Sequence, residues 1–293
     1  MYFAFVIQRN TFISAFLLWL VALSATAQRR VFNDTSPDSL ISVQVRKQLN
    51  DLSVNDYLKQ TFSKGDRSVN YRLLLPVAQR NQKKYPLVIT FHNSTRLGTD
   101  NERQLEPLAR IWLRQDIRQK YRAFVIAPQF QTRSSNYYPD SVQHCLISKP
   151  SEDVYLLFDL IREVKSRYPQ IDTNRIYLVG YSMGASTAQN LMNMAPKTFA
   201  AMVSIAAIPD FVNIKALSQK PIWLIHGRQD HDNPYEGSEY LYRASKGNHN
   251  LLFTTYNKLD HNLITIPLLL SHQIPAWLFS QHKKKYTARR SLY

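Results

Sequence analysis

The second half of the chain contains a serine, an aspartate and a histidine that could together perform nucleophilic catalysis. A serine hydroxyl is a weak nucleophile at neutral pH, so it needs a base that takes its proton and an acid that orients and stabilises that base. Ser182 lies at the centre of a Gly-x-Ser-x-Gly motif, and Asp230 and His261 each follow a later apolar run. We therefore expect Ser182 to be the nucleophile, His261 the general base and Asp230 the acid.

The motif around Ser182 joins two segments of different character. A short apolar run at residues 175–179 precedes it, and an Ala-, Gln- and Met-rich segment at residues 185–195 follows it. The first is typical of a strand and the second of a helix. In such an elbow, Gly180 and Gly184 let the backbone turn steeply, so the serine hydroxyl stands exposed at the carboxyl edge of a sheet.

Other residues could take the roles of acid and base. Asp232 lies two positions beyond Asp230 and is the second choice for the acid. Asp260 adjoins the histidine, but neighbours in a loop rarely face each other well enough to pair. We interpret His226 and His92, which end apolar runs, as packed and hydrogen-bonded turn residues rather than as bases.

The oxyanion that forms during attack on a carbonyl needs two preorganised N–H donors, worth roughly 3 kcal/mol each in the transition state. We expect the backbone N–H of Met183, at the start of the elbow helix, to be one donor. The second should come from the loop that follows His92, where Asn93 and Ser94 are the candidates.

Strand-like and helix-like patterns alternate from Asn70 onward, and this predicts an α/β fold. We expect a mostly parallel central sheet of about eight strands with helices on both faces. The predicted strands are residues 70–75, 86–92, 123–127, 175–179, 199–207, 221–226 and 251–256. The predicted helices are residues 102–121, a helix that starts at 150–153 with Ser151 as its N-cap, 185–195, 236–246 and 271–281.

The ends of the chain differ in composition from its middle. Residues 1–27 contain one positive charge, an apolar run and small residues before Gln28, and this predicts a signal peptide and a secreted or periplasmic protein. An uncleaved membrane anchor is the alternative. We expect residues 28–60 to be a linker with a short helix, residues 61–282 to be the catalytic domain, and residues 283–293 to be a basic tail.

The chain is strongly basic, with a formal net charge of +16. The positive charges are scattered, apart from those in the tail, and no nucleic-acid-binding motif is present, so we do not expect nucleic acid as a partner. The tail could contact an anionic surface.

Cys145 is the only cysteine and lies in residues 129–149, which we expect to be a long functional loop. An intramolecular disulfide cannot form, and we interpret the thiol as inert.

Several motifs in sequence order resemble those of secreted α/β-hydrolase esterases described as predicted peptidases, a group similar to polyhydroxybutyrate depolymerases and feruloyl esterases. The resemblance covers roughly residues 61 to 282. The motifs are Tyr71 to Pro76, Tyr85 to His92, Gly98 to Asn101, Ala127 to Gln129, Gly180 to Gly184 and Trp277 to Phe279. The resemblance implies a serine hydrolase for carboxylic esters, with Ser182, Asp230 and His261 at the matching positions.

Two departures from the family pattern concern the substrate side of the site. The family commonly has glycine after the histidine of the oxyanion loop, whereas Asn93 follows His92 here. A tryptophan often follows the catalytic histidine in relatives, whereas Leu263, Ile264 and Thr265 stand here.

The alternatives to an esterase are a serine peptidase of the same fold and a non-catalytic binding protein that retains the fold. We expect a small-molecule or polysaccharide-linked ester as substrate, and neither a cofactor nor a metal.

Overall fold

The computed structural model describes residues 28–36, 39–78 and 83–283 of the protein. The predicted signal peptide and the predicted basic tail, apart from Lys283, therefore lie outside the described residues. Within the described part of the chain, no helix is both long enough and apolar enough to span a bilayer.

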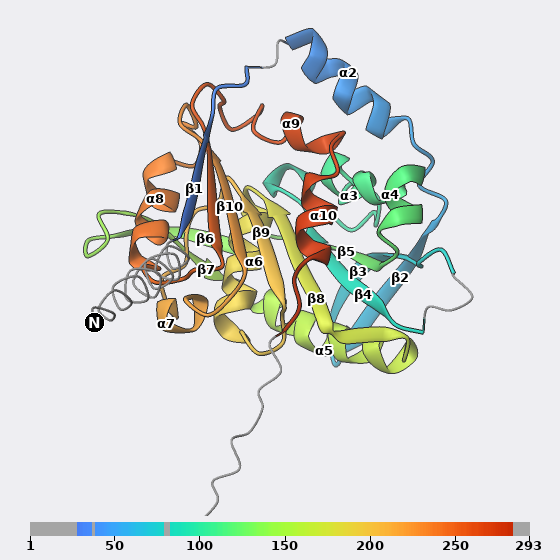
Figure 1. Ribbon diagram of the computed structural model, residues 1–293. Coiled ribbons are helices and arrows are strands. Elements are labelled where there is room, and N and C mark those ends of the chain that lie inside the picture. The colour runs from blue at the N-terminus through green and yellow to red at the C-terminus, as the bar shows by residue number, and fades with distance from the viewer. Residues whose placement is uncertain (1–27, 37–38, 79–82, 284–293) are drawn as a thin grey trace, which may run out of the picture.

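A nine-stranded sheet forms the centre of the molecule, in the order β1-β11-β10-β9-β8-β4-β5-β3-β2 (Figure 1). Its strands are β1 (Arg29–Asn33), β2 (Tyr57–Lys64), β3 (Arg67–Leu74), β4 (Tyr85–Phe91), β5 (Phe124–Gln129), β8 (Ile171–Tyr181), β9 (Ala201–Ile205), β10 (Ile222–Gly227) and β11 (Leu251–Tyr256). The seven strands from β1 to β5 in this order pair in parallel, and β3 and β2 are added antiparallel at one edge. The predicted α/β fold with a mostly parallel sheet is confirmed.

Helices cover both faces of the sheet (Figure 1). They are α2 (Ser39–Asn50), α3 (Pro107–Arg110), α4 (Gln115–Lys120), α5 (Glu152–Arg167), α6 (Met183–Met194), α7 (Ile214–Leu217), α8 (Tyr235–Ala244), α9 (Ile266–Leu269) and α10 (Gln273–Phe279), with 3-10 turns η1 (Ser94–Arg96) and η2 (Ile111–Leu113). Successive side chains of a strand point to opposite faces, so each central strand contributes side chains to a hydrophobic core on either face of the sheet. Val88 of β4 belongs to the same buried cluster as residues of α2, α3 and α10 on one face, whereas Leu87 and Ile89 belong to the cluster that includes residues of α5 and α6 on the other.

Residues 28–60 are not the linker that we predicted. β1 pairs in parallel with β11 and so extends the central sheet at one edge. The chain then passes through α2, which packs on α3 and α9, and reaches β2 at the opposite edge. The predicted boundary between residues 60 and 61 falls inside β2. The N-terminal segment therefore runs across the top of the molecule, as Figure 1 shows, and belongs to the same domain as the central sheet.

Residues 129–149 contain a hairpin rather than a long loop. β6 (Ser135–Asp140) and β7 (Cys145–Pro150) form a separate two-stranded antiparallel sheet. Its inner side contacts α6: Ser135 Oγ donates to Asn190 Oδ1 at 2.8 Å, and the Ser148 oxygens accept from Asn190 Nδ2. Cys145 lies half-buried in β7, and burial raises the pKa of its thiol, which opposes formation of the reactive thiolate.

The helix that we predicted over residues 102–121 is broken into α3, η2 and α4. Arg114, with φ −57° and ψ 128°, interrupts the helical backbone before α4, and Pro107 is the first residue of α3. Proline is tolerated there because the first N–H of a helix has no intrahelical acceptor. Ser151 does precede α5 as predicted, but its side chain makes no capping hydrogen bond.

Candidate active site

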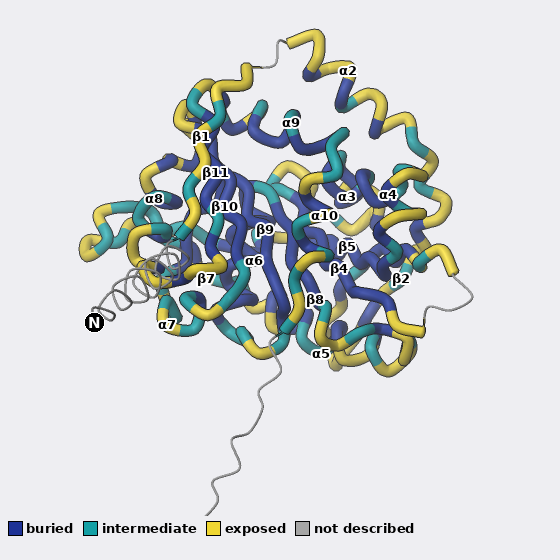
Figure 2. The backbone as a smooth tube through the Cα atoms, viewed as in Figure 1, coloured by how far each residue is buried: buried dark blue, intermediate teal, exposed yellow. Residues whose placement is uncertain are grey.

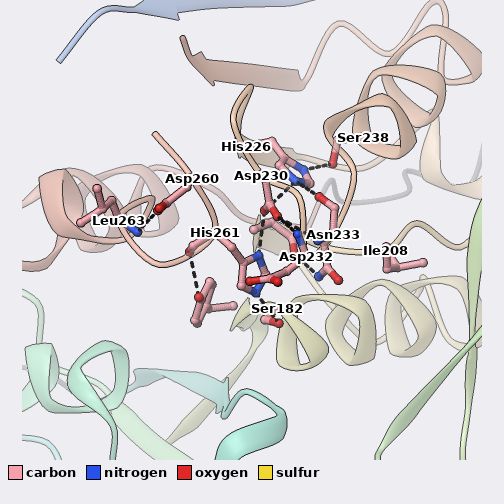
Figure 3. A network of polar contacts seen from close by, with 12 residues as sticks. Ser182, Ile208, His226, Asp230, Asp232, Asn233, Ser238, Asp260, His261 and Leu263 are labelled. Carbon is pink, nitrogen blue, oxygen red and sulfur yellow. Dashed lines mark hydrogen bonds and ion pairs between the residues drawn. The ribbon is translucent and has the colours of Figure 1, made fainter. Parts of the chain in front are cut away.

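The structure brings together the three residues that we proposed as nucleophile, base and acid (Figure 3). His261 Nε2 lies 2.9 Å from Ser182 Oγ, and His261 Nδ1 lies 2.7 Å from Asp230 Oδ2. Each residue follows a different parallel strand, β8, β10 or β11. The three residues meet because the carboxyl ends of parallel strands lie at the same edge of the sheet. The three side chains are largely buried, with 7% of Ser182 and 9% of His261 exposed, so they are shielded from bulk water without being closed off.

The backbone at Ser182 has the strained geometry of a nucleophile elbow. Its φ of 57° and ψ of −125° are rare for a residue with a side chain, and they turn the Ser182 hydroxyl out between β8 and α6. A Cβ at Gly180 would lie 2.2 Å from the carbonyl oxygen of Gly184, and a Cβ at Gly184 would lie 2.3 Å from that of Phe91. Glycine is therefore required at both positions, and the start of α6 packs directly on the end of β4.

Asp230 is held by more partners than a simple triad requires. Its Oδ2 contacts His226 Nε2 at 3.1 Å in addition to His261, and its Oδ1 accepts from the backbone N–H groups of Asp232 and Asn233. Burial by itself would raise the pKa of Asp230, but the hydrogen bonds from His226 and His261 outweigh it and hold this pKa well below its usual range. Asp230 is thus a fixed anion beneath the imidazole of His261.

His226 was expected to be a packed turn residue, and the structure shows what it packs against. It is fully buried, its Nε2 also lies 2.9 Å from the carbonyl oxygen of Asn233, and its Nδ1 lies 2.7 Å from Ser238 Oγ. A carbonyl accepts only, so Nε2 carries a proton, which it directs to the carbonyl oxygen of Asn233 and to Asp230 Oδ2. His226 is thus a second hydrogen-bond donor to the carboxylate of Asp230.

The two rival aspartates do not reach the imidazole. Asp260 Oδ1 accepts from the N–H of Leu263 at 2.8 Å, and Asp232 contributes its backbone N–H, rather than its carboxylate, to the network (Figure 3). Tyr181 also helps to position His261, a role that the sequence did not indicate. The Tyr181 hydroxyl donates to the carbonyl oxygen of His261 at 2.8 Å, and the two rings lie 5.1 Å apart.

The loop after β4 faces the triad across the sheet edge, and His92 anchors it. Phe130 N–H donates to His92 Nε2 at 3.1 Å, and His92 Nδ1 lies 2.8 Å from the carbonyl oxygen of Asn93. Burial lowers the pKa of His92 to about 4, so the ring stays neutral at physiological pH with its proton on Nδ1. His92 is a structural residue of the loop, as its place at the end of a strand indicated.

The two candidate donors of this loop differ in what they already bind. Asn93 N–H points to Glu106 Oε1 at 3.3 Å, and Asn93 Nδ2 donates to Glu106 Oε2 at 2.6 Å. Asn93 Oδ1 accepts from Thr95 N–H and caps the turn η1. Ser94 is the first residue of η1, where an N–H has no intrahelical acceptor, and within residues 28–36, 39–78 and 83–283 this N–H forms no hydrogen bond. It lines the cavity in front of Ser182, so Ser94 is the donor that remains available.

Glu106 is a buried carboxyl within the predicted helix 102–121, and its sequence context indicates no role for it. It is 6% exposed, and burial raises its pKa to about 7, although Arg96 and the Asn93 N–H act in the opposite direction. The folded protein therefore binds this proton more tightly than the unfolded chain does. The contribution of Glu106 to the unfolding free energy is present below about pH 4.5 and is lost as the pH rises to about 7.

We expect the variant Glu106→Gln to remove this pH dependence. From pH 5 to pH 8, its unfolding free energy should improve relative to the wild type by about 2.5 kcal/mol, because a neutral amide avoids the buried charge. Urea denaturation at both pH values measures the change. The matched control is Glu236→Gln at an exposed position on α8. It should leave the difference in unfolding free energy between pH 5 and pH 8 as it is in the wild type. An equal pH slope for Glu106→Gln and the wild type would show that Glu106 does not titrate in this range.

A cavity of about 970 Å³ opens in front of Ser182 and His261. The cavity is lined by the loop after β4, by residues of α2 and α3, and by the segment that leads into β6. The cavity can hold a substrate much larger than an acetyl ester. Its lining is mainly polar and aromatic, with Tyr137, Tyr138 and Tyr181 beside several charged residues.

Comparison with known proteins places this site in a familiar fold. A family model described as the prolyl oligopeptidase family matches residues 148–217, which include α5, β8, the elbow, α6 and β9. Comparison with curated protein sequences gives no match. The structure is similar to that of a thermostable esterase, with 28% identity, a TM-score of 0.70, and coverage of 78% of this chain and 64% of that one.

Two further similar structures represent the two kinds of hydrolase. An acylaminoacyl peptidase bound to Z-Gly-Gly-Phe-chloromethyl ketone is 16% identical with a TM-score of 0.55, over 83% of this chain and 44% of that one. A ferulic acid esterase is 14% identical with a TM-score of 0.55, over 76% of this chain and 97% of that one. The chain spans less than two thirds of the length of both the thermostable esterase and the peptidase. It has the α/β-hydrolase fold, and the resemblance to esterases and S9-type peptidases of this fold is confirmed.

Proposed function

We propose that this protein is a serine hydrolase that cleaves carboxylic esters through an acyl-enzyme intermediate. The observation that carries the proposal is the continuous path of contacts from Ser182 Oγ through the two ring nitrogens of His261 to Asp230 Oδ2, at 2.9 and 2.7 Å. A pure binding protein has no need for this geometry or for a strained backbone at the serine. The likeness to the thermostable esterase supports the same conclusion.

In the resting site the Ser182 hydroxyl donates to His261 Nε2, and His261 Nδ1–H donates to Asp230. During attack, Ser182 Oγ bonds to the carbonyl carbon while His261 Nε2 takes the hydroxyl proton, and Asp230 stabilises the resulting imidazolium. The C–O bond to the alcohol then breaks, and His261 returns the proton to the departing oxygen. His261 Nε2 then takes a proton from a water molecule as the water oxygen bonds to the acyl carbon, and it returns this proton to Ser182 Oγ as the bond between Oγ and the acyl carbon breaks, which releases the acid.

The carbonyl oxygen becomes negatively charged in each attack step and needs donors on the side away from His261. We assign this role to the backbone N–H groups of Met183 and Ser94. Each is the first N–H of a helical turn, so neither is used within its turn, and the packing of Gly184 on Phe91 brings the two turns together. Asn93, the alternative to Ser94, instead fixes the loop through Glu106.

A serine peptidase is the second candidate function. The prolyl oligopeptidase family model, which matches residues 148–217, and the likeness to acylaminoacyl peptidase favour it. The triad performs the same steps on an amide, with an amine as the leaving group. We place the esterase first because the thermostable esterase is similar at higher identity and TM-score than the peptidase.

Paired substrates separate the two functions. Each pair should share one acyl group and differ in the scissile bond: acetyl, butyryl and feruloyl esters against the corresponding p-nitroanilides, together with acetylated sugars and blocked dipeptide anilides. We expect kcat/KM for the esters to exceed that for the anilides by more than the difference in intrinsic reactivity, measured by alkaline hydrolysis. Anilide or peptide cleavage that matches ester cleavage after this correction would establish the peptidase instead.

A further inference from the structure

Three arginines from separate parts of the chain line the cavity in front of Ser182. Arg46 comes from α2, Arg96 from η1, and Arg133 from the segment between β5 and β6. None of the three forms an ion pair within the described residues 28–36, 39–78 and 83–283. Other partly buried arginines of this molecule do have carboxylate partners, among them Arg114 with Asp116 and Arg175 with Asp172. Within the described residues Arg110 and Arg228 also lack a carboxylate partner, but Arg46, Arg96 and Arg133 are the arginines that line the cavity.

Arg133 is held in place by an aromatic ring. Its guanidinium lies over Tyr137, 4.6 Å from the ring centre, and the side chain is only partly exposed. Such stacking orients the flat guanidinium and leaves its N–H groups in the plane available as donors. Tyr137 is itself fixed, because Ser186 Oγ of α6 lies 3.4 Å from its hydroxyl. Arg133 is thus a preorganised cation near the nucleophile.

Arg46 reaches the cavity from the N-terminal helix α2, which lies along the top of the molecule in Figures 1 and 2. Its Nη2 donates to the carbonyl oxygen of Asn262, the residue after His261. One guanidinium contact with a neutral carbonyl leaves the charge uncompensated and further donors free. Arg96 is exposed at the opposite loop, where its charge acts on Glu106 and His92 without direct pairing.

The acids that line the same cavity do not balance these charges. Asp232 is exposed and Glu106 is engaged by Asn93, and neither comes within ion-pair distance of the three arginines. Burial also holds the pKa of Glu106 near 7, so it carries only part of a negative charge at neutral pH. The cavity is therefore positively charged, and bound anions would meet preorganised donors.

We propose that the substrate is an ester that carries a free carboxylate, such as a half-ester of a dicarboxylic acid or an ester of an acidic sugar, and that Arg133 and Arg96 bind this carboxylate. The inference rests on the proposed hydrolysis of esters at Ser182. A carboxylate accepts two parallel hydrogen bonds from a guanidinium. This contact holds the scissile carbonyl at the nucleophile and favours anionic over neutral esters.

Matched substrates test the proposal on both sides of the scissile bond. 4-Acetoxybenzoate against 4-acetoxybenzamide places the charge on the leaving group, and monoethyl adipate against ethyl hexanoate places it on the acyl group. We expect the anionic member of at least one pair to have about tenfold higher kcat/KM at low salt, mainly through KM. The preference should shrink in 0.5 M NaCl because salt screens the attraction.

Arginine variants locate the effect. In Arg133→Met and in Arg96→Gln the ratio of kcat/KM for the anionic and the neutral ester should fall several-fold, and in the double variant it should approach one. Arg133→Lys should restore part of the ratio, because it keeps the charge and loses the planar contact. The matched control is Arg162→Gln on α5, an exposed arginine paired with Asp159, which should leave the ratio unchanged. Equal rates within both pairs, or a ratio that Arg133→Met and Arg96→Gln leave unchanged, would overturn the proposal.

A binding experiment keeps the two proposals separable. Calorimetry on the full chain carrying Ser182→Ala should detect adipate but not the neutral adipamide, and the pair Arg133→Met and Arg96→Gln in this background should abolish the difference. If neutral esters are hydrolysed and adipate does not bind, the protein is an esterase without this specificity. If adipate binds and no ester is hydrolysed, the anion site stands and the proposed function fails.

Discussion

Replacing Ser182 by alanine should lower kcat for p-nitrophenyl butyrate by about a millionfold, to the level that binding and the oxyanion donors alone can provide. The reason is geometric, since Ser182 Oγ is the atom that His261 Nε2 contacts at 2.9 Å at the turn between β8 and α6. The double variant Ser182→Ala/His261→Ala should be no slower than Ser182→Ala, because a nucleophile and its base act as one unit. Steady-state kinetics with purified, folded protein measures both.

The exposed serine Ser280, at the end of α10, provides the matched control. Ser280→Ala should retain the wild-type rate, and circular dichroism should show all variants folded. If the Ser182→Ala protein kept more than a few per cent of activity, another group would be the nucleophile. If the losses from Ser182→Ala and His261→Ala were additive, the two residues would act independently.

Asp230→Asn should reduce kcat by about 10⁴-fold while the fold persists. An asparagine of the same size can present its amide N–H to His261 Nδ1, and this favours the tautomer in which Nε2 carries the proton and cannot accept one from Ser182. The variant also loses the anion that stabilises the imidazolium. In this protein the substitution further disturbs His226, whose Nε2 lies 3.1 Å from Asp230 Oδ2, so we expect a lower melting temperature as well.

Asp232→Asn distinguishes between the two acids that the sequence left open. Its backbone N–H, which donates to Asp230 Oδ1 at 3.0 Å, is unaffected by the change of side chain. We expect a change in kcat of less than about threefold for a neutral ester. A loss for Asp232→Asn as large as that for Asp230→Asn would contradict the assignment of the acid.

The parts of the fold that the sequence predicted are those with continuous apolar runs. β4, β5, β10 and β11 are buried on both faces, and each begins with or contains a run of apolar residues. β1 was missed because an edge strand is half-exposed, and its sequence Arg29-Arg30-Val31-Phe32-Asn33 has no alternation. The hairpin of β6 and β7 was missed for a related reason, since its strands are short, contain proline and have few fully buried residues.

The triad could be predicted because its residues follow recognisable strands in a known order along the chain. The residues that were missed have roles that arise only from tertiary contacts. Ser182, Asp230 and His261 each follow a recognisable strand, so their positions at one sheet edge could be inferred. Glu106 belongs to no motif, and Tyr181 occupies a variable position of the Gly-x-Ser-x-Gly motif. Glu106 becomes significant only because the broken helix after residue 102 directs its buried carboxyl to Asn93, a contact that no local pattern encodes.

The arginines of the cavity show the same limit. In a chain with a net charge of +16, the sequence offers no reason to single out Arg46, Arg96 and Arg133. They become a set because α2, η1 and the segment before β6 meet above the nucleophile. The unexpected path of residues 28–60 across the molecule is what brings Arg46 there.

Mass-spectrometric mapping of a fluorophosphonate adduct tests the central claim most directly, because this reagent reacts with an activated serine and needs no knowledge of the natural substrate. We predict one adduct per folded chain, on the peptide that contains Ser182, with labelling suppressed by His261→Ala and by prior unfolding. Folded protein that remains unlabelled, or an adduct on another residue with Ser182 unmodified, would contradict the account.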